Sequence, residues 1–187
     1  MQNDIREATN VLKRGGVILY PTDTIWGIGC DATNPEAVQR IYQIKQRNDT
    51  RGMLVLMENP ALLNRYVNEV PDIAWDLAEL STTPLTIIFP EAKNLAHNLI
   101  AKDGSIGIRI TRETFTVKLL QQFRRPIVST SANVSGQKFP AIFDDISEEI
   151  KSSVDYIVNY RQDDTNPAQP SSIIKLWPDG RIDIVRK

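Results

Sequence analysis

The sequence predicts an α/β fold built on a mixed sheet, and three observations support this class. Short apolar runs of strand length alternate with amphipathic helical segments through most of the 187 residues. Pro178-Asp179-Gly180 separates two such runs near the end, which predicts an antiparallel hairpin. No internal repeat or domain boundary interrupts the pattern, so we expect a single domain over residues 1–187.

Helices are predicted where apolar residues recur at helical spacing beside start or stop signals. Ile5, Ala8, Val11 and Leu12 fall on one helical face, and Gly15-Gly16 follows as a stop. Asn34-Pro35 is a typical helix start, with Asn as N-cap and Pro at the first position, and Asn59-Pro60 repeats it. The helix after Asn34 has the apolar stripe Ala37, Val38, Ile41 and Ile44. We expect further helices over residues 71–80, 114–123 and 142–150.

Strands are predicted for the short apolar runs between these helices. They cover residues 17–20, 53–57, 85–89, 106–110 and 127–129, and residues 172–177 and 181–185 form the terminal hairpin. Residues 161–171 are polar and rich in turn-forming types, so we expect a mobile loop there.

Composition excludes several function classes. The chain has 22 Lys+Arg against 23 Asp+Glu, a formal charge of −1, which disfavours a protein that coats DNA or RNA. One cysteine, Cys30, and one histidine, His97, exclude a disulfide framework and a Cys/His zinc site. No run approaches the roughly 18 apolar residues that span a bilayer, and the first residues lack the apolar segment of a signal peptide. We therefore expect a cytoplasmic protein without membrane association.

Familiar catalytic motifs are weak or absent in this sequence. Residues 27–32 formally fit the dinucleotide pattern G-x-G-x-x-G/A, but the next helix is predicted to begin only after them, so these glycines are expected to permit tight turns. No nucleophile signature surrounds His97, which is expected to be an ordinary surface or half-buried histidine. Cys30 is expected to be a small packing residue.

A group of cations follows the helix predicted from Asn34. Lys45 lies four residues after Ile41, on the face that should be buried, and Arg47 and Arg51 follow. A buried cation there needs an anion or a path to water. Basic residues in the last turn of a helix also neutralise its carbonyl groups, and this explanation stays open.

Arg109 projects from one face of the strand predicted at residues 106–110, while the three isoleucines of that strand share the other face. Gly107 on the same face as Arg109 would leave room beside the guanidinium for a carboxylate or a phosphate. An outward, solvated arginine is the alternative.

Small polar residues follow two of the predicted strands. Residues 129–136, Ser-Thr-Ser-Ala-Asn-Val-Ser-Gly, come at the end of one, and Thr22, Asp23 and Thr24 come at the end of another. In open α/β sheets, ligands bind beyond the carboxyl ends of strands. A turn whose side chains satisfy its own backbone is the alternative. Together with the cations, these residues indicate a site that holds anions and stabilises charge without a side-chain nucleophile.

Taken together, these segments resemble the YrdC-like family, the TsaC-type threonylcarbamoyl-AMP synthases. The matching pieces, in the family's order and at about its spacing, are residues 15–32 (Gly-Gly-Val-Ile-Leu-Tyr-Pro-Thr-Asp-Thr and onward), 45–47 (Lys-Gln-Arg), 108–111 (Ile-Arg-Ile-Thr), 129–136 and 170–174 (Pro-Ser-Ser-Ile-Ile). They cover nearly the whole chain. The resemblance implies a twisted mixed sheet with flanking helices and a concave, positively charged pocket.

The resemblance also implies a reaction, in which L-threonine, bicarbonate and ATP with Mg²⁺ give threonylcarbamoyl-AMP and pyrophosphate. A separate tRNA threonylcarbamoyl transferase would then use the product to make N6-threonylcarbamoyladenosine (t6A). Lys45 and Arg47 would stabilise charge on the phosphates. The implied ATP ligands are Lys45, Arg47, Arg51, Ser131, Asn133 and Ser171, and the implied threonine ligands are Thr22, Thr24, Arg109 and Ser129.

Two other functions stay open at this point. The concave basic surface of the family could hold RNA, which gives the hypothesis of an RNA-binding module or of weak tRNA binding. The chain could also act on another carbamoyl compound, as the YrdC-like domain of hydrogenase maturation proteins does. Longer relatives carry an additional C-terminal domain, which is not expected at this length.

Overall fold

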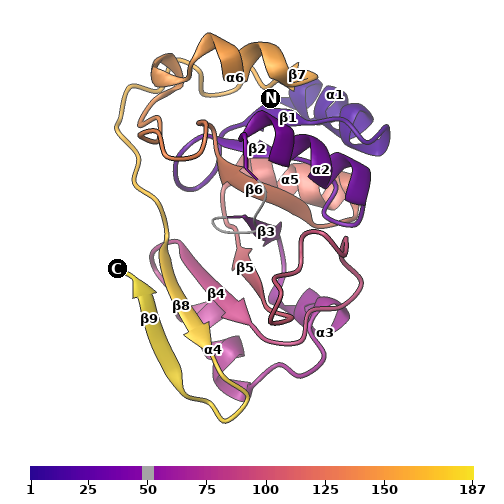
Figure 1. The fold of residues 1–187 in the computed structure, drawn as a ribbon. Helices are drawn as coiled ribbons and strands as arrows, with labels where there is room; N and C mark the ends of the chain where they lie inside the picture. The colour runs from indigo at the N-terminus through magenta and orange to yellow at the C-terminus, as the bar shows by residue number, and fades with distance from the viewer. Residues whose placement is uncertain (48–52) are drawn as a thin grey trace.

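A computed structural model describes residues 1–47 and 53–187, which form one nine-stranded sheet with flanking helices (Figure 1). The strand order is β7-β1-β2-β6-β3-β5-β4-β8-β9. The strands are β1 (Ile18–Tyr20), β2 (Gly27–Gly29), β3 (Leu54–Met57), β4 (Leu85–Phe89), β5 (Ile106–Ile110), β6 (Ile127–Ser131), β7 (Tyr156–Ile157), β8 (Ser172–Leu176) and β9 (Ile182–Arg186). Three neighbouring pairs, β1·β7, β3·β5 and β4·β8, are parallel and the other pairs are antiparallel. The predicted mixed sheet is therefore confirmed.

The helices lie close to their predicted positions. They are α1 (Gln2–Lys13), α2 (Pro35–Ile44), α3 (Leu63–Tyr66), α4 (Asp72–Leu80), α5 (Thr114–Phe123) and α6 (Glu148–Ser153), with 3₁₀ turns η1 (Pro60–Leu62) and η2 (Phe143–Asp145). The Asn34 side chain accepts hydrogen bonds from the backbone N–H groups of Glu36 at 2.9 Å and Ala37 at 3.2 Å, as an N-cap does. Among the described helices, none is long and apolar enough to cross a membrane.

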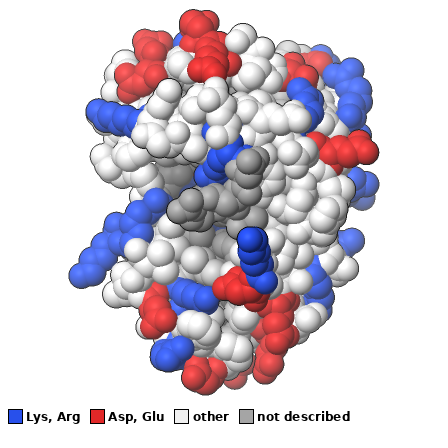
Figure 2. All heavy atoms as spheres, viewed as in Figure 1, with Lys and Arg blue, Asp and Glu red and all other residues white. Residues whose placement is uncertain are grey.

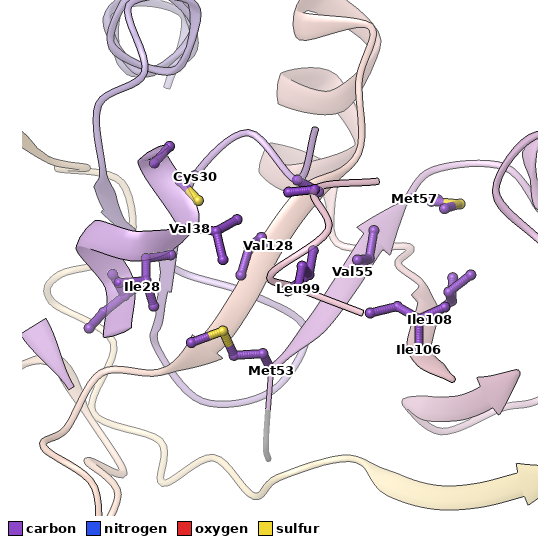
Figure 3. Close-up of a cluster of buried hydrophobic side chains, with 14 of the residues drawn as sticks. Ile28, Cys30, Val38, Met53, Val55, Met57, Leu99, Ile106, Ile108 and Val128 are labelled. Carbon is purple, nitrogen blue, oxygen red and sulfur yellow. The ribbon is translucent and has the colours of Figure 1, made fainter. Parts of the chain in front are cut away.

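The sheet separates two apolar clusters, because successive side chains of a strand point to opposite faces. Val17 and Leu19 belong to the cluster under α2, whereas Ile18 and Tyr20 belong to the cluster under α1 and α5. Figure 3 shows part of the first cluster, where strands and α2 contribute Ile28, Val38, Val55, Ile108 and Val128. This buried centre fixes the strands whose polar residues form the site described below.

The strands differ from the sequence prediction at the end of β6 and in two short additional strands. β6 continues to Ser131 instead of ending at Ser129, because it pairs with β2, with Ser131 opposite Gly27. The polar residues that were expected to begin a loop therefore lie on a strand. The short strands β2 and β7 were not predicted, since three and two residues are too few to show an alternating pattern.

The helix predicted over residues 142–150 is wrong as a single element. Residues 143–145 form the 3₁₀ turn η2, and a new helix, α6, begins at Glu148. The Ser147 side chain accepts a hydrogen bond from the backbone N–H of Ile150 at 3.4 Å, so this serine starts a helix instead of continuing one. Residues 161–171 are all described and contain neither helix nor strand.

Gly29 lies where two strands and a ring approach closely. A Cβ atom at this position would stand 2.5 Å from the Val128 backbone oxygen and 2.6 Å from the Tyr20 ring. Because these neighbours belong to the sheet and its core, they cannot move aside without cost. We expect Gly29→Ala to lower the free energy of unfolding by about 1–3 kcal/mol, measured by urea denaturation. Gly104→Ala is no suitable control, because Gly104 has a φ of +79°. The expectation is wrong if Gly29→Ala unfolds at the wild-type urea concentration.

Candidate active site

A cavity of about 510 Å³ lies against one face of the sheet. Strands β2, β3, β4, β5, β6, β8 and β9 all contribute residues to its lining. Figure 2 shows the molecule hollowed between its upper and lower halves, with Lys and Arg side chains around the hollow. Among the described residues of the lining, the charged ones are Arg109 and Arg186. The cavity is therefore suited to an anionic ligand, and its volume falls within the usual range for small-molecule sites.

Five of the sequence-predicted site residues meet in this lining. They are Thr24, Arg109, Ser129, Ser131 and Ser171. Lys45, Arg47, Asn133 and Thr22 are not among the described residues of the lining, and Arg51 lies outside the described residues. Lys45 and Thr22 each contact a residue that does line it, so both lie next to the cavity lining.

Arg109 is buried, with 3% of its surface exposed, so the interpretation as an outward, solvated arginine is wrong. Its Nη2 lies 3.0 Å from Oδ1 of Asp23. The Nε of Arg109 is also buried and has no hydrogen-bond partner among the described residues. Gly107 lines the same cavity, as its place on the Arg109 face of β5 predicts. A buried guanidinium with a free donor beside a cavity can bind a carboxylate or a phosphate.

Lys45 is the C-cap residue of α2 and is only 2% exposed. Its Nζ donates to the backbone oxygens of Ser131 at 2.6 Å and Asn133 at 2.7 Å. Lys45 therefore bonds to the last residue of β6 and to the turn that follows it, both outside its own helix. Burial, with the nearby Arg47 charge, lowers the pKa of Lys45 to about 7.

This pKa predicts how stability depends on pH. An unfolded chain keeps Lys45 protonated up to its usual pKa of 10.5, whereas the folded chain releases that proton near pH 7. Between these values the unfolded state binds more protons, so Lys45 makes the free energy of unfolding rise with pH. We expect urea midpoints from pH 7 to pH 10 to rise more steeply in the wild type than in Lys45→Met. Parallel curves for the two proteins would contradict the assignment.

Hydroxyl groups form two local networks at the site. Thr22 Oγ1 donates to the Ile25 backbone oxygen at 2.9 Å and lies 3.0 Å from Thr24 Oγ1, which fixes the turn after β1. Ser171 directly precedes β8, and its Oγ lies 2.8 Å from Oγ1 of Thr86 on β4. Since a hydroxyl can both donate and accept, these groups can rearrange around a ligand.

Asn133 partly fits the interpretation as a self-satisfied turn. Its Nδ2 donates to the backbone oxygens of Val134 at 3.0 Å and Gln137 at 2.8 Å. Its Oδ1, however, is buried and accepts no hydrogen bond from the described residues. The amide therefore holds the turn after β6 and retains one free acceptor.

Sequence reasoning missed Arg186. The predicted strand stopped at Val185, but β9 includes Arg186, which pairs opposite Ile173, a residue of the cavity lining. The Arg186 Nε and Nη2 donate to the Ser171 backbone oxygen at 2.9 and 2.7 Å. Partial burial and the Arg109 charge lower the pKa of Arg186, and the two arginines line the same cavity. Extending the hairpin by one residue would have brought Arg186 into consideration.

The dinucleotide interpretation of residues 27–32 is not supported, although Gly27 lines the cavity. Gly27 and Gly29 lie on β2, well before α2, so the helix that a dinucleotide motif requires does not begin within residues 27–32. His97 is exposed. Cys30 is fully buried in the first cluster, and burial raises the pKa of its thiol. The described residues contain no group of three or more His, Cys, Asp or Glu side chains that could hold a metal ion.

Comparison with known proteins now decides the family. The model of the Sua5/YciO/YrdC family, described as "Telomere recombination", matches residues 10–187. The chain belongs to the Sua5/YciO/YrdC family. This membership agrees with the resemblance in the sequence and with the mixed sheet.

Individual members of the Sua5/YciO/YrdC family are similar over most of the chain. A protein named threonylcarbamoyl-AMP synthase from Pseudoalteromonas translucida is 34% identical over 161 residues, 84% of this chain and 86% of that protein. The crystal structure of E. coli YciO matches with a TM-score of 0.85 and 25% identity, over 100% of this chain and 90% of YciO. The structure of P. abyssi Sua5 complexed with L-threonine matches with a TM-score of 0.82 and 24% identity, over 92% of this chain. The matched region is 50% of that Sua5 chain, so this chain spans about half its length.

Proposed function

We propose that this chain is a threonylcarbamoyl-AMP synthase, which joins L-threonine, bicarbonate and ATP into threonylcarbamoyl-AMP and releases pyrophosphate. The curated relative from Pseudoalteromonas translucida carries this name. The observation that carries the proposal is the cavity itself, which brings Arg109, Ser129 and Ser131 together from two strands, with Thr24 and Ser171 from distant loops.

Threonine would bind at the part of the cavity beside Arg109. The guanidinium would take the carboxylate, since paired N–H donors match two carboxylate oxygens. Thr24 and Ser129 would contact the rest of the amino acid. Thr22 would act by holding Thr24, since their Oγ1 atoms lie 3.0 Å apart. A protein named Sua5 binds L-threonine in its crystal structure, which supports an amino-acid site on this fold.

The nucleotide would bind toward Ser131, Asn133 and Ser171. Lys45 and Arg47 would stabilise charge on its phosphates, and Arg51 is included from the family motif. The threonine nitrogen and bicarbonate first form a carbamate with release of water. A carbamate oxygen then attacks the α-phosphorus of ATP, and pyrophosphate leaves. This nucleotidyl transfer needs alignment and charge neutralisation more than a side-chain nucleophile.

Mg²⁺ would enter as part of the substrate, bound to the phosphates of ATP. The donor set agrees, because the charged residues among the described lining are arginines, which bind phosphate and not the metal. The ion would neutralise phosphate charge during the transfer. Beyond the reaction, the product would pass to a tRNA threonylcarbamoyl transferase that makes t6A, and the enzyme would act in the cytoplasm.

The test is a reaction with the purified chain. Given L-threonine, bicarbonate, ATP and Mg²⁺, it should release pyrophosphate and yield threonylcarbamoyl-AMP, detected by mass spectrometry. Omitting either threonine or bicarbonate should stop both signals. Pyrophosphate release that does not depend on threonine would instead identify an ATP hydrolase, and a different carbamoylated product would identify a relative with another substrate.

The alternative of an RNA-binding module has weaker support. Arg109 is buried and paired with Asp23, so it is poorly placed to contact an RNA backbone. A tRNA-binding titration at several salt concentrations discriminates the two functions. Tight binding with a steep salt dependence would favour the module.

Arg186 is expected to assist binding of ATP. Its Nε and Nη2 already donate to a neutral carbonyl, so its positive charge has no carboxylate partner among the described residues. We expect Arg186→Ala to raise the KM for ATP about 10-fold, equivalent to about 1.4 kcal/mol. Arg181→Ala is the matched control, because Arg181 lies on the same hairpin but packs over the Trp177 ring, 4.6 Å from its centroid. Equal KM values in the two variants would contradict the role.

A further inference from the structure

Asp23 lies behind Arg109 as seen from the 510 Å³ cavity. Arg109 lines that cavity, whereas Asp23 lines a second cavity of about 300 Å³. The two cavities lie on opposite faces of β4 and β5. Thr86, Ile88, Gly107 and Arg109 line the first, together with Ile106 at the start of β5, and Leu85, Ile87, Phe89, Ile108 and Ile110 line the second. The Arg109–Asp23 ion pair therefore connects one face of the sheet to the other.

Two nitrogens of the Arg109 guanidinium differ in their surroundings. A guanidinium has five N–H groups, and Nη2 lies at ion-pair distance, 3.0 Å, from Asp23 Oδ1, although that oxygen accepts no hydrogen bond from the described residues. Nε is buried and has no hydrogen-bond partner among the described residues. A buried donor without a partner is costly, and the side of Arg109 that borders the larger cavity is where a ligand can supply an acceptor.

The charges around Arg109 also differ between the two cavities. Arg109 and Arg186 both line the larger cavity, and like charges beside one cavity repel each other. Asp23 is the carboxylate that balances Arg109, and it is itself only partly exposed, at 16% of its side chain. Without it, Arg109 would be a buried cation free to turn toward another acceptor, such as a backbone carbonyl.

We propose that Asp23 is a positioning residue for the amino-acid substrate: it holds one side of the Arg109 guanidinium so that the free donors stay available to the substrate carboxylate. This inference rests on the proposed function, in which Arg109 binds threonine. Asp23 itself does not contact the substrate. The effect of replacing Asp23 must therefore depend on whether the ligand has a carboxylate. If Asp23 had a purely structural role, the effect would be the same with or without that group.

The experiment compares two ligands that differ only in that group. L-Threonine and L-threoninol, which has a CH₂OH group in place of the carboxylate, are titrated into the wild type and Asp23→Asn by calorimetry. Asparagine keeps the shape of the side chain and removes its charge. Asp31→Asn is the matched control, because Asp31 is also buried and its Oδ2 lies 2.8 Å from an arginine, Arg125, but it does not line either cavity among the described residues.

In the wild type we expect threonine to bind at least 10-fold more tightly than threoninol. Asp23→Asn should weaken threonine binding about 10-fold and leave threoninol binding within 2-fold of the wild type, so that the preference for threonine disappears. Asp31→Asn should retain this preference. Equal weakening of both ligands would show a structural role and overturn the proposal, as would unchanged or tighter threonine binding. A wild type that binds neither ligand would refute the proposed function, and the positioning role with it.

Discussion

Replacing Arg109 with lysine is expected to raise the KM for L-threonine about 100-fold while the protein stays folded. Arginine can give the carboxylate two parallel charge-assisted hydrogen bonds, and lysine offers a single ammonium on a flexible stem. Losing this match should cost about 3 kcal/mol, which corresponds to that factor. Lysine keeps the positive charge beside Asp23, 3.0 Å from the present guanidinium, so the buried carboxylate is not left unpaired.

The measurement is the initial rate of pyrophosphate release against threonine concentration, with ATP and bicarbonate saturating. Arg112→Lys is the control, because Arg112 donates to the Ser81 backbone oxygen at 3.2 Å and lines only the second cavity among the described residues. Its KM should stay within 2-fold of the wild type. If Arg109→Lys also keeps a wild-type KM for threonine, Arg109 does not bind the substrate carboxylate.

The fold could be predicted well from local patterns because its main elements are long enough to show them. The apolar stripe after Asn34 and the alternation at residues 106–110 each identify an element and the face that it buries. β2 and β7 were not predicted because they form by pairing with neighbouring strands and their own residues show no strand pattern. Ser147 shows the opposite case, in which residues 142–150 have helical periodicity but a single capping side chain starts a new helix within them.

The site could be predicted only as far as its residue types. The cations and hydroxyls were identified, but their partners come from distant parts of the chain and leave no local pattern. Arg109 pairs with Asp23, and Lys45 bonds to Ser131 and Asn133, contacts that exist only once the sheet has formed. Arg186 shows the same limit, because an arginine at the end of an exposed strand has no sequence feature that places it in a cavity.

Lys45 can link ATP binding to proton uptake. Its Nζ has two acceptors, the backbone oxygens of Ser131 and Asn133, at 2.6 and 2.7 Å. A neutral amine has two N–H groups and satisfies both, whereas the protonated form has a third donor that needs an acceptor. With the pKa of Lys45 lowered to about 7, the neutral form predominates at pH 8. Phosphate oxygens beside Ser131 would supply both negative charge and an acceptor, and would raise this pKa again.

We therefore expect ATP binding to take up close to one proton per molecule at pH 8 and far less at pH 6, where Lys45 is already protonated. Calorimetric titrations of Mg-ATP in buffers of different ionisation enthalpy measure this number directly. Lys45→Met should abolish the proton uptake and weaken ATP binding at least 10-fold, because the third donor is lost and two carbonyl groups lose their partner. Lys45→Arg separates charge from titration, since arginine stays protonated at both pH values and should take up no proton. Uptake that persists in Lys45→Met would place the titrating group elsewhere and remove Lys45 from contact with the phosphates.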